Sequence, residues 1–275
     1  MGTNSIKKNL TKDSIISNIK LLLGADINNE NVYVIVEGED DIKFLSKYLN
    51  SNVTIYESFS GKNGVEEIVQ SEIICGSRVI GIRDKDYCNA PKDEKIFFYD
   101  RCCLEIMIAE FDNAFNSIYY EFYDGKMEPH KLKEHILTQL LKVSQLRKYN
   151  EENKMKINFK GLSFQSIIDD ESKMNEDKFI EQLIKLNSSN SIKIIDIFNN
   201  LPCQNTDDML DITNGHDFIL LFKVICDKRC SKRSVNEKQI SSVLRGSFNE
   251  ELLKKTSLYR SICEYSNNKV KIWCC

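Results

Sequence analysis

The sequence predicts an α/β fold, with a Rossmann-like parallel sheet as its core and a mainly helical C-terminal region. Short apolar runs rich in β-branched residues recur along the first hundred residues, at 32–36, 53–57, 77–82 and 95–99. Runs of this kind, bounded by glycine or polar turns, are typical of the interior strands of a parallel sheet. Farther along, helical spacing of apolar residues prevails, at 128–149, 176–186, 191–199, 216–228 and 235–245.

These patterns predict three regions. Residues 1–29 form an N-terminal helix, which Asp13 caps and Gly24 ends. Residues 30–120 form the α/β domain, which we expect to be catalytic. Residues 121–275 form a mainly helical region that binds a substrate or a partner.

An acidic turn follows the first predicted strand. The run Val32–Val36 ends in Glu37-Gly38-Glu39-Asp40-Asp41, and a helix begins near Ile42. In open α/β sheets, ligands bind just beyond the carboxyl ends of the strands, so we expect a site at this turn. Asp41 has two interpretations: a carboxylate that stabilises the helix N-terminus, or a member of the site.

A glycine-rich turn, SFSGKNG at 58–64, follows the second strand. With two glycines and Lys62 at a helix N-terminus, it has the groups that bind phosphate. An ordinary connection between a strand and a helix is the alternative. The turn lacks the Walker spacing, so the sequence does not indicate ATP binding.

The third strand ends in a second acidic segment, Arg83-Asp84-Lys85-Asp86-Tyr87. If the first and third strands are parallel neighbours, Glu37, Asp84 and Asp86 emerge at the same edge of the sheet. Two unit charges 4 Å apart repel by about 4 kcal/mol at an effective dielectric near 20, so such carboxylates raise one another's pKa or hold a cation. Oxygen-only ligands suit Mg²⁺ or Mn²⁺ rather than zinc.

These motifs together resemble a TOPRIM domain. The resemblance covers residues 30–120 and rests on Glu37-Gly38-x-x-Asp41, Gly61-Lys62-Asn63-Gly64 and Asp84-x-Asp86. TOPRIM domains occur in topoisomerases, primases, RNase M5-type maturases and OLD-family nucleases. Within them, VEGEDDIKFL, IRDKDY and Leu104-Glu105 are most similar to the TOPRIM effector of the PARIS anti-phage defence system.

The resemblance implies a metal-dependent nuclease. Glu37, Asp84 and Asp86 would hold Mg²⁺ or Mn²⁺, and Glu37 would also act as a general acid or base. Asp41 is a further catalytic candidate, and so is Glu105, for which a solvated helix glutamate is the alternative. Lys62, Lys85 or Lys43 would steady the phosphate.

The resemblance also implies a biological setting. It predicts a toxin-like antiviral effector restrained by an ABC-type ATPase partner, a homodimer, and a nucleic-acid substrate, with RNA such as tRNA ahead of DNA.

One segment of the helical region also carries a candidate residue, in Asn214-Gly215-His216-Asp217. Asn214 is expected to cap a helix, which places His216 in the first turn, where it could bind a phosphate or transfer a proton. A structural role is the alternative. Basic runs at 126–160 and 223–245 fit a phosphodiester substrate, or are solvated helix faces.

Composition limits the remaining classes. The formal net charge is −3 and the pI is about 5.8, so the whole chain has no basic field. The ten cysteines have no regular spacing, which predicts reduced thiols and no zinc site. No signal peptide or membrane-length apolar run is apparent, so we expect a cytoplasmic protein.

Two other function classes fit parts of the pattern. A phospho-acceptor signalling domain also carries acidic residues after its first and third strands, but it needs Thr or Ser after the fourth strand, where this chain has Tyr99-Asp100. A non-catalytic TOPRIM-like binding module is the other alternative. A topoisomerase needs larger strand-passage domains, and a primase a zinc module; neither is present in this sequence.

Overall fold

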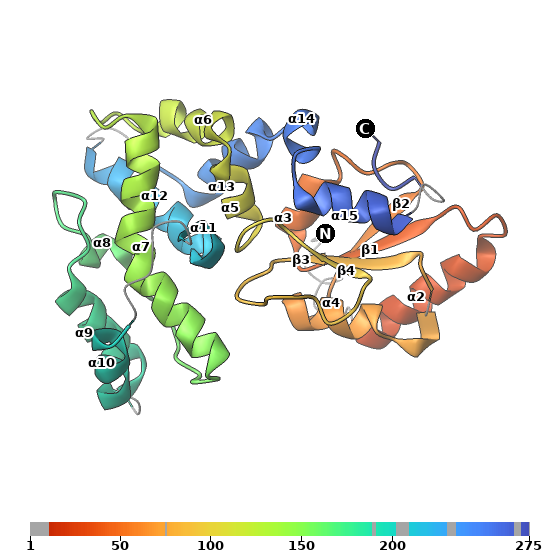
Figure 1. Ribbon diagram of the computed structural model, residues 1–275, viewed down its shortest axis with the longest axis horizontal. Helices are drawn as coiled ribbons and strands as arrows, with labels where there is room; N and C mark the ends of the chain where they lie inside the picture. Colours follow the sequence, from red (N-terminus) through yellow and green to blue (C-terminus); the bar gives the residue numbers. More distant parts are fainter. Residues whose placement is uncertain are drawn as a thin grey trace, which may run out of the picture. The chain divides into compact units, whose positions relative to one another are not determined.

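The chain forms two compact units in a computed structural model that describes residues 11–74, 76–188, 191–201, 209–229, 235–266 and 271–274 (Figure 1). The first unit comprises Met1–Leu104 together with Asn249–Cys275, and the second comprises Glu105–Phe248. The sheet lies in the first unit, and the second is built from helices. The predicted α/β class, with a helical region after the sheet, is therefore confirmed.

The sheet has four parallel strands in the order β2-β1-β3-β4. Their bounds are Val53–Glu57 for β2, Val32–Val36 for β1, Val79–Arg83 for β3 and Ile96–Phe98 for β4. Every residue of β1 and β3 is buried, which explains why these strands appear in the sequence as continuous apolar runs. Because all pairs are parallel, the carboxyl ends of the four strands meet at one edge.

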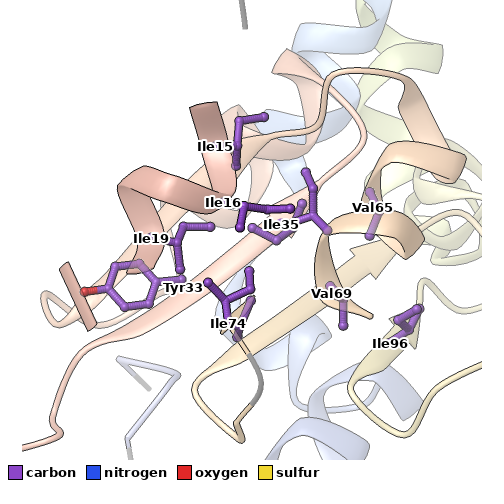
Figure 2. Close-up of a cluster of buried hydrophobic side chains, with 11 residues drawn as sticks. Ile15, Ile16, Ile19, Tyr33, Ile35, Val65, Val69, Ile74 and Ile96 are labelled. Atoms are coloured by element: carbon purple, nitrogen blue, oxygen red, sulfur yellow. The ribbon is translucent and has the colours of Figure 1, made fainter. Parts of the chain in front are cut away.

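One face of the sheet packs against α2 (Lys12–Ala25), α4 (Gly61–Val69) and the short 3₁₀ helix η1 (Glu72–Ile74). Tyr33 and Ile35 point to this face from β1, and Figure 2 shows them among the side chains of the helices. The buried cluster comprises Ile15, Ile16, Ile19, Tyr33, Ile35, Val65, Ile68, Val69, Ile74, Val79 and Ile96. This core fixes α4, and therefore the turn that begins it, against β1 and β3.

The N-terminal helix begins and ends differently from the prediction. Thr11 caps it, because its hydroxyl accepts the Ser14 N–H at 3.2 Å, whereas Asp13 lies in the first turn. The helix continues through Gly24 to Ala25. Residues 1–10 of the predicted 1–29 segment lie outside the described residues.

On the opposite face of the sheet, α3 (Glu39–Leu45) contacts β2 and α15 (Ser257–Ser266) contacts β4; α14 (Glu250–Leu253) precedes α15 in the C-terminal segment (Figure 1). Asp100, just after β4, accepts the N–H groups of Ser257 and Leu258 at 2.8 and 3.0 Å, which caps α15. The rings of Phe97 and Tyr265 lie 5.4 Å apart. The chain thus returns to the sheet unit, whereas the prediction placed all of 121–275 in one helical region.

The second unit contains helices at each place where the sequence predicts one. They are α5 (Leu104–Glu110), which starts at the last residue of the first unit, then α6 (Asp112–Phe122), α7 (Pro129–Glu152), α8 (Phe164–Ile167), α9 (Glu176–Leu186), α10 (Ser191–Asn199), α11 (Met209–Ile212), α12 (Gly215–Arg229) and α13 (Glu237–Ser247). Phe115 of α6 packs edge-on against Phe218 and Phe222 of α12. A second core joins α7, α9 and α10 through Val143, Leu146, Phe179, Leu183, Ile194 and Phe198.

Two predictions about the whole chain concern membranes and thiols. In the segments that the structure describes, no helix has both the length and the apolar character needed to cross a membrane. The described cysteines that are free thiols are Cys88, Cys102, Cys103, Cys226, Cys263 and Cys274.

Candidate functional site

The candidate site lies where the carboxyl ends of β1 and β3 meet. From β1 the chain crosses to β2 on one side, and then returns to β3 on the other. In open parallel sheets, the crevice at such a change of direction is the usual place for a ligand. Glu37 follows β1 and Asp84 follows β3 at this point, with Val36 paired to Ile82 in the register.

Glu37 is the acidic group at the centre of the site. Its Oε1 accepts a hydrogen bond from the Asp84 N–H at 2.9 Å. Burial raises the pKa of Glu37 above its ordinary value, and the Asp86 charge adds to this, while the Asp84 N–H, Arg83 and Lys62 act in the opposite direction. A carboxyl group with a raised pKa can hold or transfer a proton nearer neutral pH than an exposed glutamate can.

Asp84 connects the site to the start of the next helix. Its Oδ1 accepts the N–H of Leu104 at 3.0 Å, and Leu104 is the first residue of α5. The carboxylate therefore satisfies one of the backbone donors that a helix N-terminus leaves unpaired. The loop after β3 is tied in this way both to Glu37 and to the chain beyond β4.

Asp86 pairs with Lys62, whose Nζ lies 3.0 Å from Asp86 Oδ2. The backbone of Asp86 is in the left-handed region, with φ at 49°, and its N–H donates to Cys102 O at 2.7 Å. Such a conformation costs about 1–3 kcal/mol in a non-glycine residue, and it persists where the surrounding contacts hold it in place. Both features fix the position of the Asp86 carboxylate.

The glycine-rich turn borders Glu37 directly. Gly61 has φ at +51°, and a β carbon added there would lie 3.6 Å from Glu37 Oε2. Ser58 Oγ donates to Gly61 O at 2.7 Å, which closes the turn. Helix α4 begins at Gly61, within the glycine-rich turn, so Lys62 lies in its first turn.

Asp41 shows the helix-terminal role that was one of its two predicted interpretations. Its Oδ2 accepts the Gly38 N–H at 2.9 Å, at the start of α3. The buried Tyr99 lies near it: burial, together with the Asp41 carboxylate, raises the pKa of Tyr99 well above 10, so the phenol stays protonated. Asp41 thus holds the acidic turn that carries Glu37.

The other residues that the sequence suggested for the site are Lys85, Lys43, Glu105 and His216. Lys85 is half-buried in the turn after β3, where its carbonyl accepts the Cys88 N–H. Lys43 pairs with Glu39 and Asp40 on its own helix. Glu105 and His216 belong to the second unit, with Glu105 in the first turn of α5 and His216 exposed in the first turn of α12.

Asn214 caps α12 as predicted, because its Oδ1 accepts the Asp217 N–H at 3.2 Å. The buried residue of this segment is Asp217, beside the exposed His216. Asp217 binds Arg147 through two hydrogen bonds of 2.6 and 2.8 Å.

Some residues of the basic runs are engaged in ion pairs within the second unit. From the first run, Lys133 pairs with Asp112, Lys142 with Glu176 and Arg147 with Asp217. From the second, Lys223 pairs with Asp227 and Lys228 with Asp170. At these five positions the pairs support the interpretation as helix faces rather than as a dedicated nucleic-acid surface.

The carboxylate oxygens of the site are the type of ligand atom that Mg²⁺ prefers. Among the described residues, no three acidic, histidine or cysteine side chains gather around one point. Mg²⁺ does not need such a cage, because proteins usually bind it through one or two carboxylates together with waters and substrate phosphates. Glu37, whose Oε1 accepts the backbone N–H of Asp84, and Asp84, whose Oδ1 accepts the N–H of Leu104, are the two carboxylates that follow β1 and β3 at this edge of the sheet.

Arg83 is the residue of the site that the sequence did not single out. It is 2% exposed, and its guanidinium lies between the loop after β3 and Glu66 of α4. In a sequence, a charged residue at the end of an apolar run predicts that the strand ends there and that the residue is exposed to solvent. No local pattern predicts that Glu66, 17 positions earlier, would neutralise it in the interior.

Comparison with known proteins adds no family to this description. No family model matches the chain, and no curated protein matches its sequence.

Proposed function

We propose that this chain is a Mg²⁺-dependent phosphodiesterase that cleaves nucleic acid. The observation that carries the proposal is the contact of the Glu37 carboxylate with the backbone N–H of Asp84 at the change of strand direction, with the Lys62–Asp86 ion pair on the same loop and the adjoining turn. Carboxylates for a cation and an amine for a phosphate, at the position where open sheets bind ligands, suit a phosphodiester substrate.

In this reaction we assign roles to four residues, Glu37, Asp84, Lys62 and Asp86. Glu37 and Asp84 would hold the ion, which when bound supplies charge stabilisation of the phosphate and a more acidic water. As the alternative to binding the ion, Glu37, whose pKa is raised by burial, would hold or accept a proton at its carboxylate. Lys62 exchanges its partner Asp86 for a phosphate oxygen of the substrate, and Asp86 then becomes a further carboxylate for a cation.

The biological setting is proposed from the resemblance to TOPRIM effectors. The chain would be a toxin-like nuclease in anti-phage defence, controlled by an ABC-type ATPase, and would act as a homodimer. RNA such as tRNA is the preferred substrate in this proposal, ahead of DNA.

The test is cleavage of total tRNA and of plasmid DNA by the purified protein, in Mg²⁺, Mn²⁺ or EDTA. Glu37→Gln and Asp84→Asn should each abolish a metal-dependent cleavage. Glu67→Gln is the matched control, because Glu67 is an exposed glutamate of α4 that pairs with Lys12 of α2. Cleavage that persists in EDTA, or that survives in both site variants, would rule the proposal out.

A second candidate is a non-catalytic binding module of the same fold. The Lys62–Asp86 ion pair favours it, because an amine that neutralises a carboxylate competes with any cation. If this candidate is right, Glu37→Gln leaves the biological effect of the protein intact in cells while partner binding persists.

A phospho-acceptor domain is less well supported. Tyr99 follows β4 where that class needs Thr or Ser, and the Asp100 carboxylate caps α15. Within the described residues the sheet has four strands, so no fifth strand supplies the lysine that this class requires.

A further inference from the structure

Arg83 ends β3 with its charge in the interior of the first unit. Its Nη2 lies 3.1 Å from Glu66 Oε1, and its guanidinium carbon lies 4.7 Å from the centre of the Phe98 ring. Glu66 is itself buried, and its second oxygen binds the exposed Lys92 at 2.7 Å. The buried group is therefore an ion pair between β3 and α4, with Lys92 completing it from the surface.

Packing alone does not account for this pair. Removing two charges from water costs several kcal/mol per ion, and apolar residues of similar volume often fill such a place with equal or better stability. The Nε of Arg83 is also buried, and has no hydrogen-bond partner among the described residues. Because the buried charge is costly, we look for a contact that the guanidinium makes and that an apolar side chain such as methionine or leucine could not make.

The held segment is the loop that carries the site aspartates. Arg83 Nη1 donates to the Asp84 carbonyl at 2.6 Å, and Nη2 contacts Cys88 Sγ at 3.6 Å, so one guanidinium binds both ends of the loop 84–88. Asp86, in the middle, keeps the left-handed backbone that places its carboxylate at Lys62. Glu66 anchors the guanidinium from α4, the helix whose first turn contains Lys62.

From this geometry we infer that Arg83 is a positioning residue for the site. The guanidinium holds loop 84–88 in the conformation that presents Asp84 and Asp86 beside Glu37, and Glu66 holds the guanidinium. The inference rests on the proposed function for its consequence, which is that loss of Arg83 weakens cation binding although Arg83 touches no cation.

Two variants separate positioning from folding. Arg83→Met removes the hydrogen bonds to the loop and leaves Glu66 paired with Lys92. Arg83→Met/Glu66→Met replaces the buried ion pair by apolar side chains, a change that often leaves stability equal or higher. For wild type and both variants, we would measure thermal unfolding, amide hydrogen exchange of residues 84–88 and the affinity for Mn²⁺ by calorimetry.

We expect Arg83→Met to speed exchange in the loop by about tenfold, because the opening of a local segment becomes easier once its anchor is lost. The Mn²⁺ affinity should fall by about tenfold, a range that is usual when residues supporting the ligands of a metal are removed. The double variant should unfold near the wild-type temperature and keep both defects.

The inference is overturned if loop exchange in Arg83→Met equals that of wild type, or if the double variant recovers loop protection together with its stability. If wild type itself binds no Mn²⁺, the proposed function fails, and the exchange measurement alone decides the role of Arg83. Should Arg83→Met not fold, Arg83→Lys replaces it, since a lysine keeps the charge and cannot bind both ends of the loop.

Discussion

Glu37 combines burial with a single strong backbone donor, and its ionisation should therefore affect the stability of the fold. Its pKa lies above the ordinary 4.5, so the folded chain favours the protonated carboxyl relative to the unfolded chain. The stabilisation from this group is present below pH 4.5 and is lost as the pH rises through the raised pKa.

Glu37→Gln should mimic the protonated state at every pH. We expect the unfolding temperature of the variant, relative to wild type, to rise as the pH increases from 4.5 through the raised pKa of Glu37, when both proteins are measured in EDTA. The amide oxygen of the substituted side chain can still accept the Asp84 N–H, which keeps the comparison close. A difference in unfolding temperature between Glu37→Gln and wild type that is constant or falls with pH would contradict the raised pKa. Glu67→Gln is the control for replacing a glutamate elsewhere in the chain.

Lys62→Met should separate cation binding from catalysis. The Lys62 amine neutralises Asp86, and both side chains are partly exposed. Removing a partly exposed partner of this kind changes binding by up to about 1 kcal/mol, so Mn²⁺ affinity should rise by up to about fivefold.

Cleavage by Lys62→Met should nevertheless fall by at least about tenfold, because the phosphate loses its donor. Calorimetry and the tRNA or plasmid assay measure the two effects. Lys12→Met is the control, because it removes an amine that pairs with Glu67 of α4. A fall in Mn²⁺ affinity would show that Lys62 does not compete with a cation.

At the scale of elements, the contact of α4 with the sheet sets the distance from Lys62 to the acidic residues. Gly81 of β3 allows this contact, since a β carbon there would lie 2.7 Å from Val65 Cγ1 and 3.1 Å from Val69 Cγ2. A strand interior ordinarily favours a β-branched residue, so the glycine reflects this close approach.

Gly81→Ala should therefore destabilise the first unit by about 1–3 kcal/mol in urea unfolding, the range for overpacked cores. Gly24→Ala is the matched control, because nothing lies within 4 Å of the added carbon in α2. That change should stabilise by about 0.5–1 kcal/mol, since alanine is the better helix residue. If Gly81→Ala were neutral, α4 would be free to shift away from β3.

The sequence predicted the strands and the meeting of Glu37 with Asp84 because both follow from local patterns and one rule of sheet geometry. Buried parallel strands appear as continuous apolar runs, and parallel neighbours bring their ends together. The role of Arg83 and the start of α4 at Gly61 were not predictable in this way. The burial of Arg83 depends on its contact with Glu66, far apart in the chain, about which periodicity carries no information. The first turn of α4 contains two glycines, which are poor helix residues and hide the start of the helix.

The return of residues 249–275 to the sheet is a third case. The segment was expected to be helical, and α14 and α15 are helices, yet helical spacing does not specify the packing partner. Individual contacts join the segment to the sheet unit, such as the Asp100 carboxylate at the start of α15 and the backbone bridge between Leu49 and Trp273.

At the scale of the whole molecule, each unit has its own buried charge pair. In the second unit, Arg147 holds the buried Asp217 with two hydrogen bonds and lies over the Phe159 ring at 4.4 Å. Arg147→Met should destabilise by about 3–5 kcal/mol, because it leaves a carboxylate buried without its partner.

Hydrogen exchange should locate this loss in residues 105–248 and leave the amides of β1 and β3 protected. Lys142→Met is the control, since its exposed pair with Glu176 is worth at most about 1 kcal/mol. Equal loss of protection in the sheet would indicate that the two units unfold as one.

Mn²⁺ binding measured by calorimetry without nucleic acid decides whether Glu37 and Asp84 form a cation site for phosphodiester chemistry. Wild type and Glu67→Gln should bind Mn²⁺ alike, while Glu37→Gln and Asp84→Asn should each bind it at least about tenfold more weakly, since Mg²⁺-type sites rely on one or two carboxylates. Equal affinity in all four proteins, or no binding by wild type, would contradict the claim.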